Sequence, residues 1–270
     1  VAFASELGID VIITDHHLPH GILPKAVAIV NPKLAESTYP NGHLSGAGVA
    51  FKLAQALHQA TGGNANEIPE EWLALTAVGL CADAVPLLGE NRALVKKGLA
   101  ALSRNPSPAF RALIDTAGLL GKEINSWKVL FQLAPMINAA GRLEEASQAV
   151  AFFLNNNAMA AAATALHLKQ LNTERKKLEQ TAADACMATL EAEEDGAIAP
   201  FLTLYSDGWH PGIIGIVASR LLEKYHRSAL VVSLSGDIGR GSMRTLSTID
   251  AVEALSFCGD LLENFGGHSR

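Results

Sequence analysis

Three side chains that can bind a metal or move a proton, Asp15, His16 and His17, stand next to one another early in the chain. They directly follow the apolar, β-branched run 11–14, which predicts a fully buried strand. Ligands of open α/β sheets bind at the carboxyl ends of the strands. Because neighbours on an extended chain point in opposite directions, we expect one histidine to bind a metal. The other would face the substrate, where it can donate a proton or a hydrogen bond to phosphate.

The same three residues have a purely structural interpretation. An aspartate that caps a turn, followed by two solvated histidines, would produce the same tripeptide. Taken alone, the tripeptide favours this interpretation, because short motifs often match by chance. The chemical hypothesis therefore depends on what the rest of the chain supplies.

Asp83 is a single carboxylate inside the apolar segment 79–87, at the end of a predicted helix. A buried, unpaired aspartate is costly, so we expect this residue to meet a cation. A hard divalent ion such as Mg²⁺ or Mn²⁺ suits a set of carboxylate and imidazole ligands. The alternative, that Asp83 caps the segment before Pro86, is equally consistent with the sequence.

Arg142 closes a segment of small residues, 138–142, that begins with Asn138 and contains Gly141. Gly141 permits an unusual backbone turn, and the small side chains allow a ligand to approach closely. Arg142 is expected at the start of a helix, where its charge opposes the helix dipole, so we infer an anion partner. A surface salt bridge is the alternative.

A glycine-rich turn at 209–215 contains His210 and leads into a predicted helix that includes Arg220. Free N–H groups at the start of such a helix bind anions. Most glycine-rich turns are structural, however, so this segment alone is a weak signal.

Two further segments strengthen the signal. Arg240, Ser242 and Arg244 alternate along a predicted strand and would share one face, which suits a phosphate backbone. A close-approach loop then contains Gly266, Gly267 and His268. Together with the glycine-rich turn, they predict a polyanion-binding domain.

The elements that must position these residues can be predicted from periodicity. Strands are expected at 11–14 and 26–30, with Ser45 as the cap of the first of several helices. These helices are expected at 45–59, 70–80, 91–102, 108–117 and 126–133.

Residues 142–195 contain neither Gly nor Pro, which predicts two helices with a break at 155–157. The second helix suits a bridge between two domains, and its apolar stripe comprises Leu171, Leu178, Ala182, Cys186 and Leu190. Beyond it, strands are expected at 201–205, 228–233 and 239–244, and helices at 213–225 and 248–256.

The composition of the 270 residues, 49% hydrophobic and 18% charged, fits a folded chain with one large domain or two modest ones. The net charge of -6 is a weak argument against a nucleic-acid partner, since a few arginines at a cleft can bind phosphate. Three cysteines without CxxC spacing favour a reducing cytoplasm over a disulfide framework. No signal peptide or membrane-spanning run is visible. Both ends of the sequence look cut, so we expect a fragment.

In this order, the segments resemble the DHH phosphoesterase superfamily, and within it the RecJ-like exonucleases. The resemblance runs almost from end to end. Its motifs are ThrAspHisHis at 14–17, AsnPro at 31–32, the segment 44–51, AlaAspAlaValProLeu at 82–87, AsnArg at 91–92, AsnAlaAlaGlyArgLeu at 138–143, LeuAsn at 171–172 with Arg175, the segment 209–220, and GlyGlyHis at 266–268.

The resemblance implies an α/β fold: a DHH domain with a parallel sheet and helices over 1–155, a long linker helix over 156–195, and a smaller mixed α/β DHHA1 domain over 196–270. It implies two Mn²⁺ or Mg²⁺ ions that activate water for attack on a phosphodiester. His16 and Asp83 match metal ligands. His17 matches the histidine that contacts the scissile phosphate, and Asp15 supports the site.

Further residues match positions that bind the substrate in the family. Arg142 matches a phosphate-binding arginine. The substrate-binding set predicted in this way comprises Asn138, Arg142, His210, Arg220, Ser242, Arg244, Gly266, Gly267 and His268.

Two departures from the family's pattern matter. The upstream aspartate motifs of the family are absent, since only Asp10 and Asp15 occur before residue 80. A complete two-metal site cannot form from these residues alone, so the fragment by itself is expected to be inactive. Met243 stands where the family usually has Gly, and Thr245 where it usually has Ser.

The resemblance therefore predicts a 5′-to-3′ exonuclease that hydrolyses single-stranded DNA in repair and recombination. We expect a cytoplasmic monomer that binds single-stranded DNA, no membrane, and a helicase and a single-strand-binding protein as candidate partners. The alternatives are another DHH phosphodiesterase, acting on oligoribonucleotides or cyclic dinucleotides, and a non-catalytic DHH scaffold. Intact Asp15, His16, His17 and Asp83 argue against the scaffold.

Overall fold

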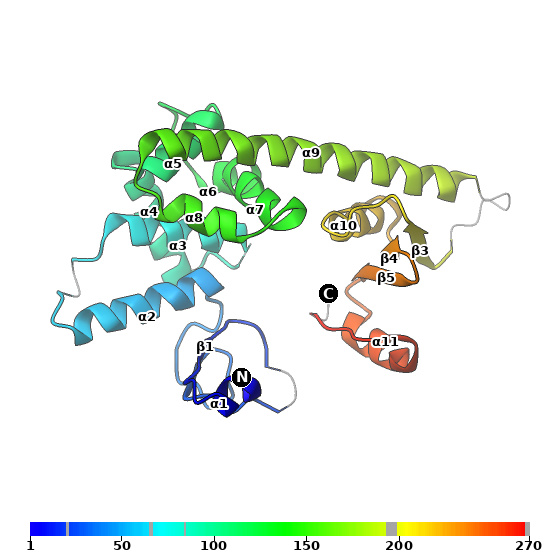
Figure 1. The fold of residues 1–270 in the computed structure, drawn as a ribbon, viewed down its shortest axis with the longest axis horizontal. Coiled ribbons are helices and arrows are strands. Elements are labelled where there is room, and N and C mark those ends of the chain that lie inside the picture. Colours follow the sequence, from blue (N-terminus) through cyan, green and yellow to red (C-terminus); the bar gives the residue numbers. More distant parts are fainter. Residues whose placement is uncertain (20–21, 65–66, 84, 193–198, 268–270) are drawn as a thin grey trace. The chain divides into compact units, whose positions relative to one another are not determined.

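The computed structural model describes residues 1–19, 22–64, 67–83, 85–192 and 199–267. Two compact units can be distinguished along the chain (Figure 1). The first comprises residues 1–135 and 151–166, and the second comprises residues 136–150 and 167–270.

The first unit begins with helix α1 (Ala2–Glu6) and a parallel pair of strands, β1 (Ile12–Thr14) and β2 (Ala28–Val30). The strand predicted at 11–14 exists, but the expectation that it is fully buried is wrong. Ile12 is 62% exposed. A sheet of two short strands has too little surface to bury both faces of either strand.

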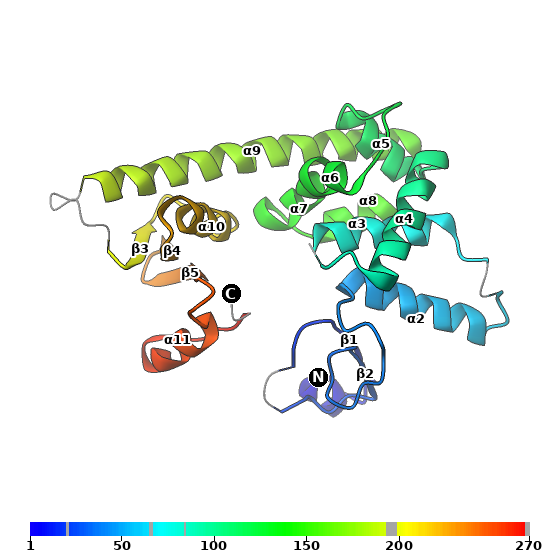
Figure 2. The same ribbon diagram turned by 180° about the vertical axis from the view of Figure 1, so that it is seen from behind.

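Helices provide most of the first unit. Ser45 caps α2 (Gly46–Ala60), as predicted, because its hydroxyl accepts a hydrogen bond from the Gly48 amide. Helices α3 (Glu70–Ala82) and α4 (Gly89–Arg104) lie side by side (Figure 2), and α5 (Pro108–Thr116) follows. Gly98 permits this contact, since a Cβ there would overlap the carbonyl oxygen of Leu73.

The helix predicted at 126–133 is interrupted. A short turn, α6 (Ser126–Lys128), runs into a π-helical turn, η1 (Val129–Leu133), and only then into α7 (Ala134–Leu143). Arg142 therefore lies in the last turn of a helix, and the expectation that it starts one is wrong. A cation at this end is stabilised by the helix dipole, so the dipole gives no reason to expect an anion partner.

The break predicted at 155–157 is confirmed, because it separates α8 (Ser147–Leu154) from α9 (Ala158–Glu191). The Asn157 side chain caps the N-terminus of α9, because its Oδ1 accepts hydrogen bonds from the amides of Met159 and Ala160. The 34-residue α9 is shared by the two units.

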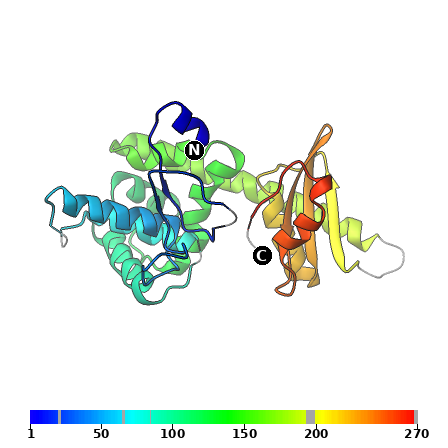
Figure 3. The same ribbon diagram turned by 90° about the horizontal axis from the view of Figure 1, so that it is seen from below.

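The second unit contains a mixed sheet of three strands, β3 (Phe201–Ser206), β4 (Ser228–Ser235) and β5 (Ile238–Arg244) (Figure 3). Strand β4 pairs with β3 in parallel and with β5 in antiparallel orientation. Helix α10 (Ile214–Tyr225) packs on this sheet. After β5 the chain continues with α11 (Ala251–Phe257) and the 3₁₀ turn η2 (Gly259–Leu261).

The core of the second unit joins α9, α10 and the sheet. Ala182, Cys186 and Leu190 of the predicted apolar stripe pack there against buried residues of β3, β4 and α10. The mixed α/β class with a parallel strand pair and many helices is confirmed. Over the residues that the structure describes, no helix is both long and apolar enough to cross a membrane.

Candidate metal centre and phosphate-binding cluster

The loop after β1 folds back on itself through the Asp15 carboxylate. Its Oδ1 accepts hydrogen bonds from the amides of His16 (2.7 Å) and His17 (3.2 Å) and lies 2.7 Å from the His17 Nδ1. Such a turn leaves the extended conformation of the strand. The two histidine rings consequently lie only 4.2 Å apart between centroids, so the expectation that they point in opposite directions is wrong.

These hydrogen bonds also determine the charge state of Asp15. Partial burial by itself would raise the pKa of the carboxyl group. Hydrogen bonds from the His17 side chain and from the amides of His16 and His17 outweigh burial, so the pKa of Asp15 lies below its usual value. Asp15 is therefore a carboxylate at neutral pH and orients the His17 ring.

A buried asparagine attaches this loop to the second strand. The Asn31 side chain donates a hydrogen bond to the His17 carbonyl oxygen (2.9 Å) and accepts one from the Lys33 amide. The Asp15 amide donates to the Val30 carbonyl oxygen at the end of β2. The loop is thus fixed at both of its ends.

Asp83, the residue that ends α3, lies beside His16. Its Oδ2 is 3.5 Å from the His16 Nδ1. The expectation of a buried aspartate is wrong, because the Asp83 side chain is 41% exposed, whereas that of His16 is 17% exposed. The expectation that Asp83 meets a cationic or metal-binding partner thus rests on this contact and not on burial.

We name Asp15, His16, His17 and Asp83 the histidine cluster. One donor atom from each of Asp15, His16 and His17 lies within 4.8 Å of the others. Carboxylate oxygens and imidazole nitrogens are donors that Mn²⁺ accepts, and carboxylates also suit Mg²⁺. The donor types therefore fit a divalent metal ion, and Asp83 adds a carboxylate oxygen 3.5 Å from His16.

In the second unit, the end of α7 meets the turn that precedes α10. The Arg142 guanidinium donates a hydrogen bond to the Gly212 carbonyl oxygen (3.1 Å). A Cβ at residue 212 would overlap the carbonyl oxygen of Arg142, so this contact requires glycine. The Gly212 amide in turn donates to the His210 Nδ1 (3.0 Å), which shapes the turn.

Strand β5 approaches the first turn of α10 equally closely. A Cβ on Gly215 would lie 3.0 Å from the Ser242 hydroxyl and 3.2 Å from the Arg244 guanidinium. Ser242 and Arg244 share one strand face, as predicted, and are joined by a 3.3 Å hydrogen bond. This hydroxyl and guanidinium therefore lie against the N-terminal turn of α10, the end of a helix that favours anions.

Positive charge is concentrated at this point. Arg142 is exposed, yet the surrounding chain partly desolvates its guanidinium; this desolvation and the nearby Arg175 lower its pKa. Glu179 opposes the lowering, and Arg244 adds to it. Like charges held so close to one another favour an anion between them.

Glu179 is the carboxylate of this cluster. It lies 2.7 Å from Arg175, whose guanidinium also donates to Asn172, and 3.4 Å from Arg220. Arg220 donates a second hydrogen bond to Gln180. We name Arg142, Arg175, Arg220, Arg244 and Glu179 the arginine cluster; its four cations and one anion leave an excess of positive charge.

The structure places the remaining predicted substrate-binding residues as follows. Asn138 is exposed on α7. It lines a hollow of about 390 Å³ together with Ile137, Gly141, Arg142, Ala146 and Ala149. Gly266 and Gly267 follow η2, and Gly267 has a φ of 150° that other residues rarely adopt. His268 lies outside the described residues.

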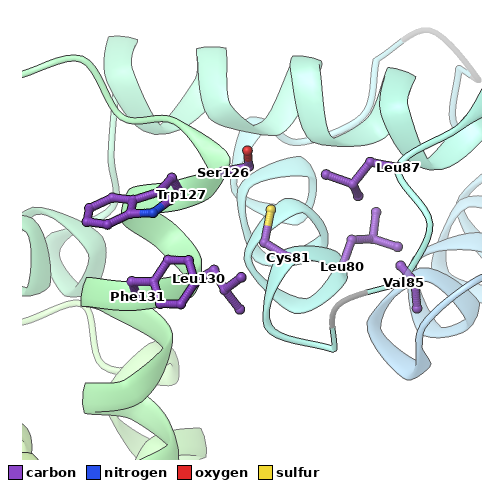
Figure 4. Close-up of a pocket in the computed structure, with 8 residues that line it drawn as sticks. All are labelled: Leu80, Cys81, Val85, Leu87, Ser126, Trp127, Leu130 and Phe131. Carbon is purple, nitrogen blue, oxygen red and sulfur yellow. The ribbon is translucent and has the colours of Figure 1, made fainter. Parts of the chain in front are cut away.

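An apolar hollow of about 330 Å³ occupies the space between the end of α3 and the turns α6 and η1 (Figure 4). Among its described lining residues, Cys81 is the one with an ionisable side chain, and burial raises the pKa of this thiol. A protonated thiol is a poor metal ligand and nucleophile, so this hollow adds no catalytic group to the site. Its lining residues are Leu80, Cys81, Val85, Leu87, Ser126, Trp127, Leu130 and Phe131.

Two features of the candidate sites were not predicted from the sequence. Glu179 was not singled out, although it occurs four residues after Arg175, the spacing at which helical residues form ion pairs. The motif AsnArg at 91–92 was noted without a role, and the structure places Asn91 in a buried polar network.

Comparison with known protein families agrees with this description. Residues 1–80 match the DHH family, N-terminal domain, and residues 198–270 match the DHHA1 domain. The chain therefore belongs to the DHH family and has a DHHA1 domain.

Within the family, the similarity is to RecJ. The single-stranded-DNA-specific exonucleases RecJ of Bacillus subtilis and Thermus thermophilus are each 41% identical to the chain, over 267 and 265 residues. Each similarity covers 98% of this chain, which spans 33% and 37% of the length of these two relatives.

Solved structures give the same result. RecJ from Thermus thermophilus in complex with Mn²⁺ has a TM-score of 0.87 and 38% identity, covering 100% of this chain and 39% of that one. An exonuclease RecJ bound to manganese has a TM-score of 0.81 and 38% identity, and covers 99% of this chain and 65% of that one.

Proposed function

We propose that this chain carries part of the metal centre and the phosphate-binding surface of an exonuclease. The enzyme would hydrolyse phosphodiester bonds of single-stranded DNA in the 5′-to-3′ direction, in DNA repair and recombination. The supporting observation is that Asp15, His16, His17 and Asp83 form one cluster in a chain similar over 98% of its length to single-stranded-DNA-specific exonucleases.

His16 and Asp83 are proposed as metal ligands, for Mn²⁺ or Mg²⁺ in a two-metal site. A bound divalent ion lowers the pKa of a coordinated water and neutralises charge on the phosphate. His17 would donate a hydrogen bond or a proton to the scissile phosphate. Asp15 would hold His17 in the orientation and tautomer that this role requires, through the 2.7 Å contact to Nδ1.

The arginine cluster is proposed to bind the strand through its phosphates. Arg142, Ser242, Arg244 and the first amides of α10 surround a position suited to one phosphate group. Arg220 would add positive charge while Glu179 and Gln180 hold its guanidinium. Asn138, His210, Gly266, Gly267 and His268 complete the proposed substrate-binding set.

We also propose the domain boundaries 1–155, 156–195 and 196–270, the last of which the DHHA1 match over 198–270 supports. Monomeric state, a cytoplasmic location, and a helicase and a single-strand-binding protein as partners belong to the same proposal. The monomeric state and the two partners are inferred from the resemblance to RecJ-like exonucleases, and the cytoplasmic location also from the three cysteines without CxxC spacing.

The proposal is tested with the full-length protein and single-stranded DNA. We expect release of mononucleotides from 5′ ends that requires Mn²⁺ or Mg²⁺ and stops with EDTA. Hydrolysis of oligoribonucleotides or cyclic dinucleotides without attack on a long DNA strand would instead assign the chain to another DHH phosphodiesterase. No metal-dependent hydrolysis of any of these substrates would favour a scaffold.

A further inference from the structure

Asn91, near the start of α4, uses its whole side chain to connect separate segments of the chain. It is 1% exposed. Its amide nitrogen donates to the carbonyl oxygens of His43 (2.7 Å) and Pro86 (3.0 Å), and its Oδ1 accepts from the Asn41 side chain (3.0 Å). An asparagine amide offers two donors, and both are used on backbone carbonyl groups.

Both of these segments lead to the histidine cluster. Pro86 follows Asp83 by three residues, so the hydrogen bond to its carbonyl oxygen holds the segment into which the chain continues after Asp83. His43 precedes Gly46, the first residue of α2, whose backbone lies against His16: a Cβ there would be 3.5 Å from the His16 Cδ2. Asn91 therefore connects the segment after Asp83 to the segment beside the His16 ring.

A second polar residue of the same helix turn reinforces this connection. Glu90 accepts hydrogen bonds from the Tyr39 hydroxyl (2.9 Å) and the Asn41 amide (3.3 Å), and forms an ion pair with Lys52 of α2 (3.1 Å). Burial and Glu90 raise the pKa of Tyr39 to about 12, so its hydroxyl remains a donor at neutral pH. Asn41 is thereby fixed from two sides.

We propose that Asn91 is a positioning residue for the metal centre. It fixes the segment that follows Asp83 and the segment beside the His16 ring, and thereby sets the distance between His16 and Asp83. This inference rests on the proposed function, since it assumes that His16 and Asp83 bind a metal. Groups that orient metal ligands change metal affinity or activity by about 10- to 100-fold when they are removed. Asn91 contacts neither ligand side chain and acts through the backbone.

The test compares the full-length protein with its Asn91→Ala variant. We measure the Mn²⁺ dissociation constant by calorimetric titration without DNA, and the melting temperature with and without Mn²⁺. The variant is expected to bind Mn²⁺ about 10- to 100-fold more weakly. Its KM for single-stranded DNA should stay unchanged, and its kcat should recover when the Mn²⁺ concentration is raised.

Asn125→Ala is the matched control. Asn125 is another asparagine of the first unit whose side chain accepts a backbone hydrogen bond, from the Lys128 amide at the start of α6, and no hydrogen bond of its side chain to a described residue of the histidine cluster is seen. It should lower the melting temperature and leave the Mn²⁺ dissociation constant unchanged. If Asn91→Ala loses stability but keeps the wild-type Mn²⁺ affinity, Asn91 is structural only and the inference is wrong.

If Asn91→Ala does not fold, the Asn41→Ala variant tests the same inference. Asn41 is half-buried, and the substitution removes its one hydrogen bond to the Asn91 side chain. It should weaken Mn²⁺ binding by about threefold, which is less than the loss expected for Asn91→Ala. An unchanged affinity would refute the inference. Absence of Mn²⁺ binding by the wild type would overturn the proposed function as well, whereas wild-type binding that Asn91→Ala and Asn41→Ala leave intact overturns this inference alone.

Discussion

The histidine cluster of the first unit and the arginine cluster of the second hold concentrated charge by different means. In the histidine cluster, hydrogen bonds from asparagines and amides fix the loops, and the side chains remain partly exposed. Beside the arginine cluster, Gly212 and Gly215 let neighbouring segments approach closely, and the Arg142 guanidinium donates to the Gly212 carbonyl oxygen. The first arrangement leaves donor atoms for a cation, and the second leaves positive charge for an anion.

Because of this difference, substitutions in the two clusters should affect function and stability differently. Changes at Asp15, His17 and Asp83 of the histidine cluster should remove function with a modest loss of stability, because these side chains are 41–50% exposed. Changes at Gly212 and Gly215, which pack against the arginine cluster, should reduce stability and binding together, because the close packing itself forms the site.

The largest effect is expected from His16→Ala and Asp83→Ala. Each removes one proposed metal ligand, so metal-dependent hydrolysis should fall by more than about 100-fold, beyond the loss seen when only a supporting group is removed. Turnover and Mn²⁺ affinity of the full-length variants provide the measurement. His167→Ala, which breaks an exposed ion pair with Glu144, is the control and should be active. Wild-type Mn²⁺ affinity in both ligand variants would refute the assignment.

Gly212→Ala should destabilise the second unit. The new methyl group overlaps the Arg142 carbonyl oxygen, and overpacking of this kind costs about 2 kcal/mol, or roughly 4–8 °C in melting temperature. Gly208→Ala is the control, since its Cβ would meet only the Ser206 hydroxyl at 3.8 Å. Equal melting temperatures for the two variants would show that the turn adapts and that close packing does not form this site.

Arg244→Ala should weaken binding of single-stranded DNA uniformly across sequences. Loss of one phosphate contact lowers the salt dependence of log K by about 0.7 per contact for a single strand. Binding titrations at several salt concentrations measure this slope. Arg227→Ala, at an exposed residue whose guanidinium donates to the neighbouring His226 carbonyl oxygen, should leave the slope unchanged. Identical slopes for both variants and the wild type would remove Arg244 from the phosphate site.

The smallest effect concerns pH. The pKa of Asp15 is lowered in the folded protein, so its contribution to stability is present above the ordinary value of 3.8 and is lost as the pH falls through the lowered value. Asp15→Asn should lower the melting temperature at pH 7 by about 1–2 °C, as is typical of exposed pairs. The difference from the wild type should vanish at the acidic end of the titration. A difference that persists there would show that the charge of Asp15 is not its cause.

Local patterns were sufficient to predict much of the fold. The strand before Asp15, the helix that ends at Asp83 and the break before α9 each follow from apolar periodicity or from capping residues nearby in the sequence. The same patterns placed Ser242 and Arg244 on one strand face. Each of these features depends on neighbours within a few residues.

Features that depend on tertiary contacts could not be predicted in this way. The π-helical turn η1 joins α6 directly to α7, so the helical path that begins at residue 126 continues to residue 143. The position of Arg142 at the end of that path could not be predicted from the local sequence pattern. The exposure of Asp83 depends on which elements cover α3. The pairing of Arg220 with Glu179 joins residues that are 41 positions apart, and no local pattern indicates it.

The proposed metal centre is tested most directly by measuring hydrolysis of 5′-phosphorylated single-stranded DNA by the full-length protein and its Asp83→Ala variant over a range of Mn²⁺ concentrations. We expect the wild type to release mononucleotides in proportion to its Mn²⁺ occupancy, and the variant to release almost none at any Mn²⁺ concentration. Equal, metal-independent hydrolysis by both proteins would contradict the claim that the histidine cluster is part of a metal centre.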